Sequence, residues 1–358
     1  MSVTTQPSTY QSFFQETVES VPPATSEVLE TYSGIPKDAH AEHVINCRNA
    51  AYEKCPYPCI GSLRFLNFDL AGLPAYQEHV LGPLKKPTKE GELEPLFLDL
   101  GTCFGQDVRK LVYDGAPIAR LWASDIEQRL IDVGFKLFND EQKLPRDHFL
   151  CPADLFSTSP DDQLRLLNDK VTVLQMTAVF HLFSLEDQKK AADRSLRLLR
   201  KDTGGPVLLL GMQVGNVVAG PFLRKNVSVG YSHKYRHNVE SWETMWKEVA
   251  ESGEWKDRIE KLEVKSELLA SGTRSNSADN PNFDESQIRR HNFECPVLGD
   301  PASRSNDQEM GIRNKAVRYS TVITVMQFSK VIHEIRNQVI FSSSGFGASD
   351  WEILLVKH

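Results

Sequence analysis

Short apolar runs alternate with amphipathic stretches through the middle of the chain. Five runs have the length and composition of strands that are buried on both faces: 96–100, 119–123, 148–151, 171–175 and 207–212. Between them, apolar residues recur at three- and four-residue spacing, the pattern of helices that pack on one side, in 106–113, 127–138 and 185–199. This alternation predicts an α/β fold with a doubly wound, mainly parallel sheet.

The first quarter of the chain has a different pattern. Residues 1–40 are rich in Ser, Thr, Pro and Glu, so we expect a flexible N-terminal tail there. Residues 41–94 hold a helical pattern, a further apolar stretch and a linker of Lys, Glu, Gly and Pro, and we expect a helical cap and linker. Such a cap either closes over a cleft or lies flat on the core. The ligand-binding domain is expected at 95–270.

The pattern is less regular toward the C-terminus. A helix is predicted at 239–251 and a strand at 261–269. Residues 271–345 are polar, and we expect an insertion that is partly disordered. Residues 318–328 and 346–358 both contain strand-like runs, and we assign the closing strand of the sheet to 346–358. The predicted sheet then has seven strands.

Composition narrows the range of partners. A net charge of −7 and a pI near 5.9 argue against nucleic acid or an anionic membrane surface as the main partner. No apolar run reaches the roughly 20 residues that a membrane span needs, and the N-terminus lacks the pattern of a secretory signal. The six cysteines fit neither a disulfide framework nor a zinc site, so we expect free thiols, no bound metal and a cytoplasmic protein.

The most informative segment is the loop after the first predicted strand, Gly101-Thr-Cys-Phe-Gly105. The two glycines permit a tight turn and let a ligand approach the backbone at the carboxyl ends of the strands, where open α/β sheets bind ligands. Dinucleotide enzymes instead carry Gly-x-Gly-x-x-Gly for two phosphates. Here Asp99 and Asp107 flank the loop. Their negative charges attract a cationic ligand and repel a ligand that carries phosphates.

Acidic residues also follow the second and third predicted strands. Asp125, about 20 residues after the loop, can accept hydrogen bonds from ribose hydroxyls, while Ile126 can cover an adenine ring. In the segment Ala153-Asp154-Leu155, the carboxylate can accept from the adenine amino group and Leu155 can cover its face. Individually, such acids can instead be helix caps. Acids at three successive strand ends predict a nucleoside ligand that carries a positive charge.

These segments resemble the motifs of class I S-adenosylmethionine-dependent methyltransferases. More narrowly, three of them resemble the fungal methyltransferases of meroterpenoid biosynthesis: Leu98-Asp-Leu-Gly-Thr-Cys-Phe-Gly-Gln-Asp-Val-Arg, Leu121-Trp-Ala-Ser-Asp-Ile-Glu and Tyr235-Arg-His-Asn-Val-Glu-Ser-Trp-Glu-Thr-Met-Trp. The similarity covers roughly residues 40 to 270. After Gly272 the chain departs from the family pattern through a long extra segment.

The resemblance implies a Rossmann-like methyltransferase fold with S-adenosyl-L-methionine as the cofactor. It places the donor on Asp125, Ile126, Ala153, Asp154 and Leu155. It also implies a small-molecule acceptor, methylation of a carboxyl oxygen on a polyketide–terpenoid intermediate, and a homodimer.

The acceptor side is less well defined by the sequence. A carboxylate acceptor is ionised at neutral pH and needs no general base, whereas a phenol or alcohol needs one, usually His. His181 is the best-placed candidate for a catalytic base, although a histidine between apolar neighbours is more often a packed core residue. His233, Arg236 and His237 can pair with a substrate carboxylate, or they lie at the surface.

Four functional hypotheses follow. The first is an O-methyltransferase that forms a methyl ester on a hydrophobic, meroterpenoid-like carboxylic acid in fungal secondary metabolism. The second methylates a phenol or an amine with the same donor site. The third is a methyltransferase fold that binds the donor but catalyses a rearrangement without methylation, or acts as a binding subunit. The fourth, a nicotinamide-dependent oxidoreductase, is disfavoured by the glycine spacing.

Overall fold

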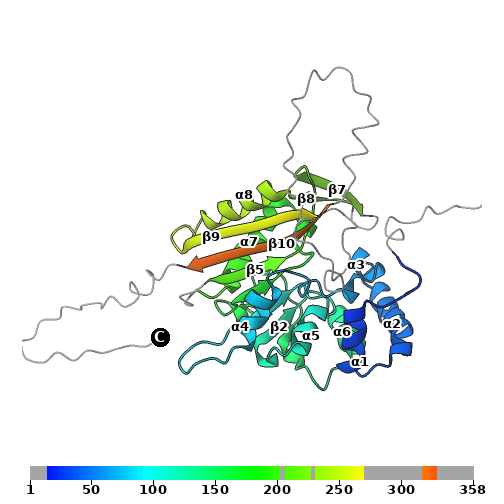
Figure 1. Cartoon of the computed structure of the whole chain (residues 1–358). Helices are drawn as coiled ribbons and strands as arrows, with labels where there is room; N and C mark the ends of the chain where they lie inside the picture. Colours follow the sequence, from blue (N-terminus) through cyan, green and yellow to red (C-terminus); the bar gives the residue numbers. More distant parts are fainter. Residues whose placement is uncertain (1–13, 202–205, 227–229, 270–316, 329–358) are drawn as a thin grey trace, which may run out of the picture.

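The computed structural model describes residues 14–201, 206–226, 230–269 and 317–328, and a single central sheet organises them (Figure 1). Its strands are β1 (Phe97–Leu100), β2 (Leu121–Ser124), β3 (Phe149–Leu150), β4 (Val173–Gln175), β5 (Val207–Gly211), β6 (Val214–Gly215), β9 (Ile259–Leu269) and β10 (Val317–Phe328). The order is β3-β2-β1-β4-β5-β10-β6, and β9 pairs with β10 as well. Strands β1 to β5 pair in parallel, as the alternating sequence pattern predicts.

The predicted number of seven strands is wrong. The five parallel strands are extended by β10, which pairs antiparallel with β5, and by β6 and β9, which both pair antiparallel with β10. Strand β6 is a two-residue strand that pairs with β10 just beyond the end of β5. Strand β10 lies between β5 and β9, because Met326 pairs with Val207 on one side and Leu262 on the other.

The boundary of the predicted insertion also needs correction, since β10 falls inside 271–345. Of the two strand-like runs near the C-terminus, the longer one therefore occupies the place beside β5. The predicted closing strand at 346–358 lies outside the described residues.

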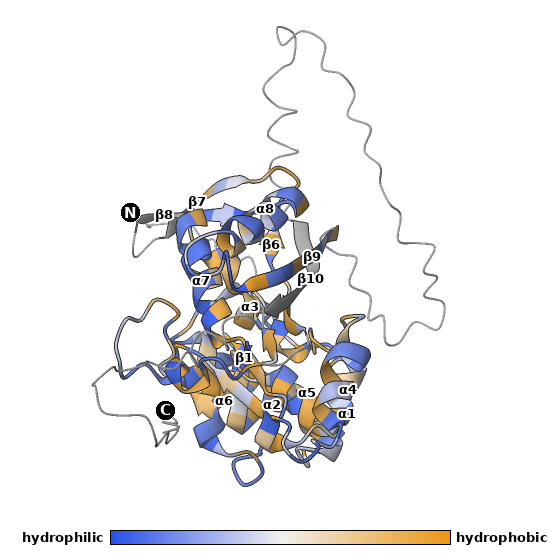
Figure 2. Ribbon diagram, turned by 90° about the vertical axis from the view of Figure 1, so that its left-hand side faces the viewer, coloured by the Kyte–Doolittle hydropathy of each residue, from blue (hydrophilic) through white to orange (hydrophobic). Residues whose placement is uncertain are grey.

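Helices cover both faces of the sheet. They are α1 (Pro23–Thr31), α2 (His40–Tyr52), α3 (Pro58–Gly61), α4 (Gly82–Lys85), α5 (Gln106–Tyr113), α6 (Gln128–Phe138), α7 (Leu185–Leu198) and α8 (Val239–Ala250). Successive strand residues point to opposite faces. Leu98 therefore packs with residues of α7 and α8, whereas Phe97 packs with residues of α5 and α6. Hydrophobic residues accordingly concentrate in the interior around β1 (Figure 2).

The N-terminal helices form a cap that lies flat on the core beside α6 (Figure 1). Val28, Leu29 and Val44 of the cap share one apolar cluster with Leu137 and Phe138 of α6. The predicted tail is therefore too long: residues 14–40 include α1, because their few apolar side chains are enough to pack against α6. Within the described residues, no helix is long and apolar enough to cross a membrane.

Between β6 and α8 the chain forms a separate hairpin of β7 (Gly220–Asn226) and β8 (Gly230–Arg236). The following helix α8 begins with a capping box in which the Asn238 side chain accepts from the Ser241 backbone, and Ser241 Oγ accepts from the Asn238 backbone. The end of the hairpin lies beside the segments that follow β4 and β5, because Tyr235 N–H donates to Phe183 O and Asn216 N–H donates to His237 O.

Candidate active site

The loop after β1 is held in a conformation that requires glycine. Gly101, Cys103 and Gly105 have φ values of 79°, 55° and 65°, in the left-handed region that residues with a Cβ rarely adopt. A Cβ on Gly101 would lie 2.5 Å from Val179 Cγ2, and one on Gly105 would lie 2.5 Å from Arg109 Nη1. Side chains at positions 101 and 105 would therefore collide with neighbouring protein atoms. Glycine is required there for this reason as well as for the predicted approach of a ligand.

Asp125 joins this loop to the end of β2. Its Oδ2 accepts a hydrogen bond of 2.8 Å from the Cys103 backbone N–H, and its Oδ1 accepts one of 3.0 Å from Glu127 N–H. Burial raises the pKa of Asp125, and the backbone donors oppose this rise. Each carboxylate oxygen has a second lone pair, so the group can still accept from ribose hydroxyls. The adjacent Ile126 side chain is 61% exposed and available to a ligand.

Two further carboxyl groups lie buried below the loop. Asp99 Oδ2 accepts from Thr102 Oγ1 at 2.6 Å, and burial raises the Asp99 pKa to about 7. Asp107 accepts from Leu70 N–H at 3.0 Å and from Gln175 Nε2 at 2.8 Å, and burial together with the charge of Asp99 raises its pKa. Asp107 was expected to flank the loop beside a cationic ligand, but these bonds make it a buried link between α5, β4 and Leu70 of the cap.

The segment after β3 is tied to the same edge. Ala153 N–H donates to Asp125 O at 3.0 Å. Asp154 Oδ1 accepts from Phe156 N–H at 2.9 Å, which makes it the start of a local turn. Leu155 is buried in the core on the α7 and α8 side of the sheet, so its predicted position over an adenine face would require the segment to move.

Exposed apolar side chains gather around this edge of the sheet. Ile126 follows β2, Phe156 follows β3 and Leu182 follows β4, and all three are exposed. Tyr57, 47% exposed, belongs to the cap; partial burial raises its pKa, and the charges of Cys55 and Asp125 raise it further. Exposed apolar groups at the carboxyl ends of strands are suited to an adenine ring and a hydrophobic acceptor.

Three buried polar atoms beside the loop have no hydrogen-bond partner among the described residues: Ser124 Oγ, Gln175 Oε1 and Gln106 Oε1. Ser124 ends β2, Gln175 ends β4 and Gln106 begins α5. Buried polar groups without partners are rare in native proteins. Together with the glycine loop and the buried acids, they fit a polar, positively charged nucleoside at this edge.

His181 lies past the end of β4, with Nδ1 3.4 Å from both Gln213 Oε1 and Val214 N. Burial lowers the pKa of His181 to about 3; Lys234, Arg64 and Arg236 lower it further, while Gln213 raises it. His181 is therefore a neutral, weak base near pH 7, with several positive charges around it. General bases work best when their pKa is near the operating pH.

The other predicted substrate residues have different surroundings. His237 is buried, with Nδ1 2.9 Å from Ser241 Oγ and Nε2 3.1 Å from Gln188 Oε1. Both ring nitrogens thus have protein partners that link β8 to α8 and α7, and burial lowers the His237 pKa to about 4. The guanidinium of Arg236 lies 3.6 Å from the ring centre of Phe222. The side chain of His233 lies outside the described part of the chain.

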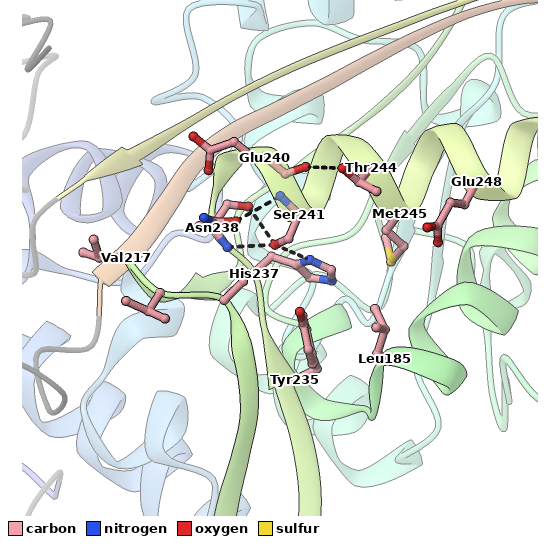
Figure 3. A pocket seen from close by; sticks show the side chains of 12 residues that line it. Leu185, Val217, Tyr235, His237, Asn238, Glu240, Ser241, Thr244, Met245 and Glu248 are labelled. Carbon is pink, nitrogen blue, oxygen red and sulfur yellow. Dashed lines mark hydrogen bonds between the residues drawn. The ribbon is translucent and has the colours of Figure 1, made fainter. Parts of the chain in front are cut away.

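A pocket of about 610 Å³ opens where α7 and α8 begin, beside the β6–β7 connection (Figure 3). His237 forms part of its wall, along with Tyr235 and Met245. Tyr235 and His237 follow β5 in the sequence, in the same segment as the predicted substrate residues His233 and Arg236. No group of His, Cys, Asp and Glu side chains suitable for a metal ion occurs within the described ranges.

The parallel sheet, glycine loop and acidic strand ends define a class I methyltransferase fold. A model of the meroterpenoid methyltransferase N-terminal domain matches residues 13–66, which correspond to most of the cap. The O-methyltransferase phiE of a fungal species is 36% identical over 240 residues, covering 66% of this chain and 75% of phiE. The Asnovolin E/Chermesin D methyltransferase nvfJ of Aspergillus novofumigatus is 32% identical over 253 residues, covering 69% of this chain and 83% of nvfJ.

A solved structure that aligns with this chain is a SAM-dependent methyltransferase from Archaeoglobus fulgidus, with 11% identity and a TM-score of 0.38 over 72% of this chain and 94% of that chain. The sequence relatives establish the family: the chain belongs to the fungal methyltransferases that include phiE and nvfJ. The prediction of a methyltransferase that uses S-adenosyl-L-methionine is thereby confirmed.

Proposed function

We propose that the enzyme forms a methyl ester on the carboxyl group of a hydrophobic, meroterpenoid-like acid in fungal secondary metabolism. S-adenosyl-L-methionine supplies the methyl group from its sulfonium. In the proposed donor site, Asp99, Asp125 and Asp154 bind its polar groups, and Gly101 and Gly105 shape the loop. Ile126 and Ala153 contact the adenine, and Leu155 joins them once the segment after β3 moves. A cytoplasmic location and a homodimer, both expected earlier, belong to this proposal.

The observation that carries the proposal is the charge around His181. Lys234 and Arg236 at the end of β8 contribute positive charge there, as does Arg64, which is paired with Asp69 at 2.8 Å, and His181 itself is a weak base. An anionic acceptor gains from nearby cations and needs no proton removed, whereas a phenol gains little and lacks an effective base. The cationic acceptor side also complements the acidic donor side at Asp99 and Asp125.

The chemistry suits a buried site. One carboxylate oxygen attacks the methyl carbon as the carbon–sulfur bond breaks, giving a neutral ester and a neutral thioether. Because opposite charges are lost along the reaction, a water-poor site favours the transition state over the separated ions. The chain's contribution is to align the two molecules and to exclude water.

The test compares hydrophobic aromatic acids with matched phenols and amines, with formation of S-adenosylhomocysteine as the measured rate. We expect turnover with acids, and we expect His181→Gln to change kcat less than tenfold, since no base is required. Loss of a true general base reduces the rate by about 100- to 10,000-fold, and that result would favour the phenol hypothesis. Arg236→Gln should raise KM for the acid, while Lys247→Gln, which removes an exposed α8 cation paired with Glu243, serves as the charge-matched control.

A further inference from the structure

Arg109 lies in α5, directly behind the loop Gly101–Gly105, which we call the donor loop. The Arg109 side chain is completely buried. Its Nη1 donates to Phe104 O at 2.8 Å and to Gly105 O at 3.3 Å. Its Nε and Nη2 donate to the two carboxylate oxygens of Asp140 at 2.8 Å and 3.0 Å. One guanidinium therefore holds two consecutive loop carbonyls and is itself held by a bidentate ion pair.

The loop needs such support because of its backbone conformation. Cys103, which carries a Cβ, has a φ of 55° between two glycines that also have positive φ. Strained backbone of this kind persists only where the surrounding structure fixes it. Asp125 holds Cys103 N–H on one side. On the other side α6 approaches so closely that a Cβ on Gly134 would lie 2.3 Å from Phe104 O.

The cap reaches the same ion pair. Tyr32, the residue after α1, donates from its hydroxyl to Asp140 Oδ2 at 2.9 Å. Asn139 Nδ2 donates to Ser33 O at 3.3 Å, and Lys143 Nζ donates to Tyr32 O. The end of α1 is thus attached to the segment after α6 at the carboxylate that orients Arg109.

We propose that Arg109 is a positioning residue for methyl-donor binding and that the chain Tyr32–Asp140–Arg109 couples the cap to the donor loop. Tyr32 orients Asp140, Asp140 orients Arg109, and Arg109 fixes the Phe104 and Gly105 carbonyls on the side of the loop away from the ligand. Donor affinity then depends on a cap residue that contacts neither the loop backbone nor Asp125. The proposal rests on the proposed donor site and is independent of the acceptor.

The chain offers a matched control for Tyr32. Tyr113 also joins the core to α1 through a tyrosine–carboxylate hydrogen bond, from its hydroxyl to Glu27 Oε1 at 2.7 Å, but this bond is at the surface. Tyr32→Phe and Tyr113→Phe each remove one hydroxyl between the cap and the core. Only the first removes a bond to Asp140.

A second matched pair compares two buried arginines that donate to backbone carbonyls. Arg109→Lys alters the donor-loop contacts, whereas Arg120→Lys alters contacts to Leu84 O and Lys86 O, both at 2.7 Å. Lysine keeps the charge but cannot make the same planar set of bonds.

The experiment is calorimetric titration of the full chain with S-adenosylhomocysteine, well below the unfolding temperature of each variant. We expect Tyr32→Phe to raise Kd about threefold or more and Arg109→Lys about tenfold or more, the range that network mutations produce. Both controls should stay within about twofold of the wild-type Kd. A purely structural role would lower the unfolding midpoint without changing Kd, and that outcome for Tyr32→Phe would overturn the proposal.

Two other outcomes are distinguishable. If Arg109→Lys does not fold, the comparison of Tyr32→Phe with Tyr113→Phe decides the question alone. Asp125→Ala separates this inference from the donor-site assignment. If Asp125→Ala abolishes binding and Tyr32→Phe does not weaken it, the donor site stands and the coupling is refuted. If Asp125→Ala binds normally, the site itself is wrong.

Discussion

Donor binding should depend on pH through Asp99, because its carboxyl group is buried and carries a pKa of about 7 without ligand. A cationic donor favours the ionised carboxylate and therefore lowers this pKa on binding. Only the fraction of the protein in which Asp99 is ionised is ready to bind the cationic donor. This fraction is about 9% at pH 6 and about 91% at pH 8, so the apparent Kd should be about tenfold larger at pH 6.

The sign of the effect on stability follows from the same pKa. In the donor-free protein, Asp99 binds a proton more tightly than in the unfolded chain, where the value is 3.8. The contribution of Asp99 to the free energy of unfolding therefore becomes less favourable as the pH rises from about 4 to about 7. The donor offsets this loss, so it should raise the unfolding midpoint more at pH 8 than at pH 6.

The perturbation is Asp99→Asn, which keeps an oxygen that can accept from Thr102 Oγ1. Titration calorimetry with S-adenosylmethionine should show a weaker Kd for the variant at pH 8 and a flatter dependence on pH. Titration in two buffers of different ionisation enthalpy should show proton release by the wild type near pH 7. An equal Kd at both pH values for the wild type, or an unchanged slope in Asp99→Asn, would refute the reasoning. Asp107 also has a raised pKa, so the variant retains any slope due to that group.

Two further predictions concern stability and are checked by chemical denaturation. Gly134→Ala should destabilise the protein by about 1–3 kcal/mol or more, because the new Cβ overlaps Phe104 O, which is backbone and cannot easily move; Gly72→Ala, with no neighbour closer than 3.6 Å, is the control, and an equal effect of both would contradict this explanation. Leu137→Ala should cost about 2–5 kcal/mol and unfold cap and core in one transition, because Leu137 is buried in the cluster that they share; a separate early transition of the cap would contradict a common core.

The parallel part of the fold was predictable because its signals are local. Each strand of β1 to β5 is a short apolar run, and each intervening helix has its own amphipathic pattern. The antiparallel edge was not predictable in this way, since β10 pairs with β5 over more than one hundred residues of sequence. The two strand-like runs at 318–328 and 346–358 were both candidates for the position beside β5, and their periodicity does not distinguish between them.

In the site, too, features set by local sequence were predictable and those set by distant residues were not. Gly101, Gly105, Asp99 and Asp125 were identified from their positions at strand ends, and the structure brings them to one edge of the sheet. The surroundings of His237 depend on Gln188, 49 residues away, and could not be inferred from its neighbours in the sequence.

The role of Arg109 was also missed. Its position on an otherwise amphipathic helix gives no sign that it is buried, and its partner Asp140 lies 31 residues further on. Burial of a charged group becomes visible only once the partner is placed beside it.

The most direct test of the proposed function is to determine which atom receives the methyl group. The enzyme is incubated with S-adenosylmethionine that carries an isotopically labelled methyl group and with a hydrophobic aromatic acid that has both a carboxyl and a phenolic hydroxyl. The proposal predicts that the label appears in a methyl ester, which alkaline hydrolysis releases as methanol. Label in a phenolic ether that survives hydrolysis, or donor binding without any labelled product, would contradict it.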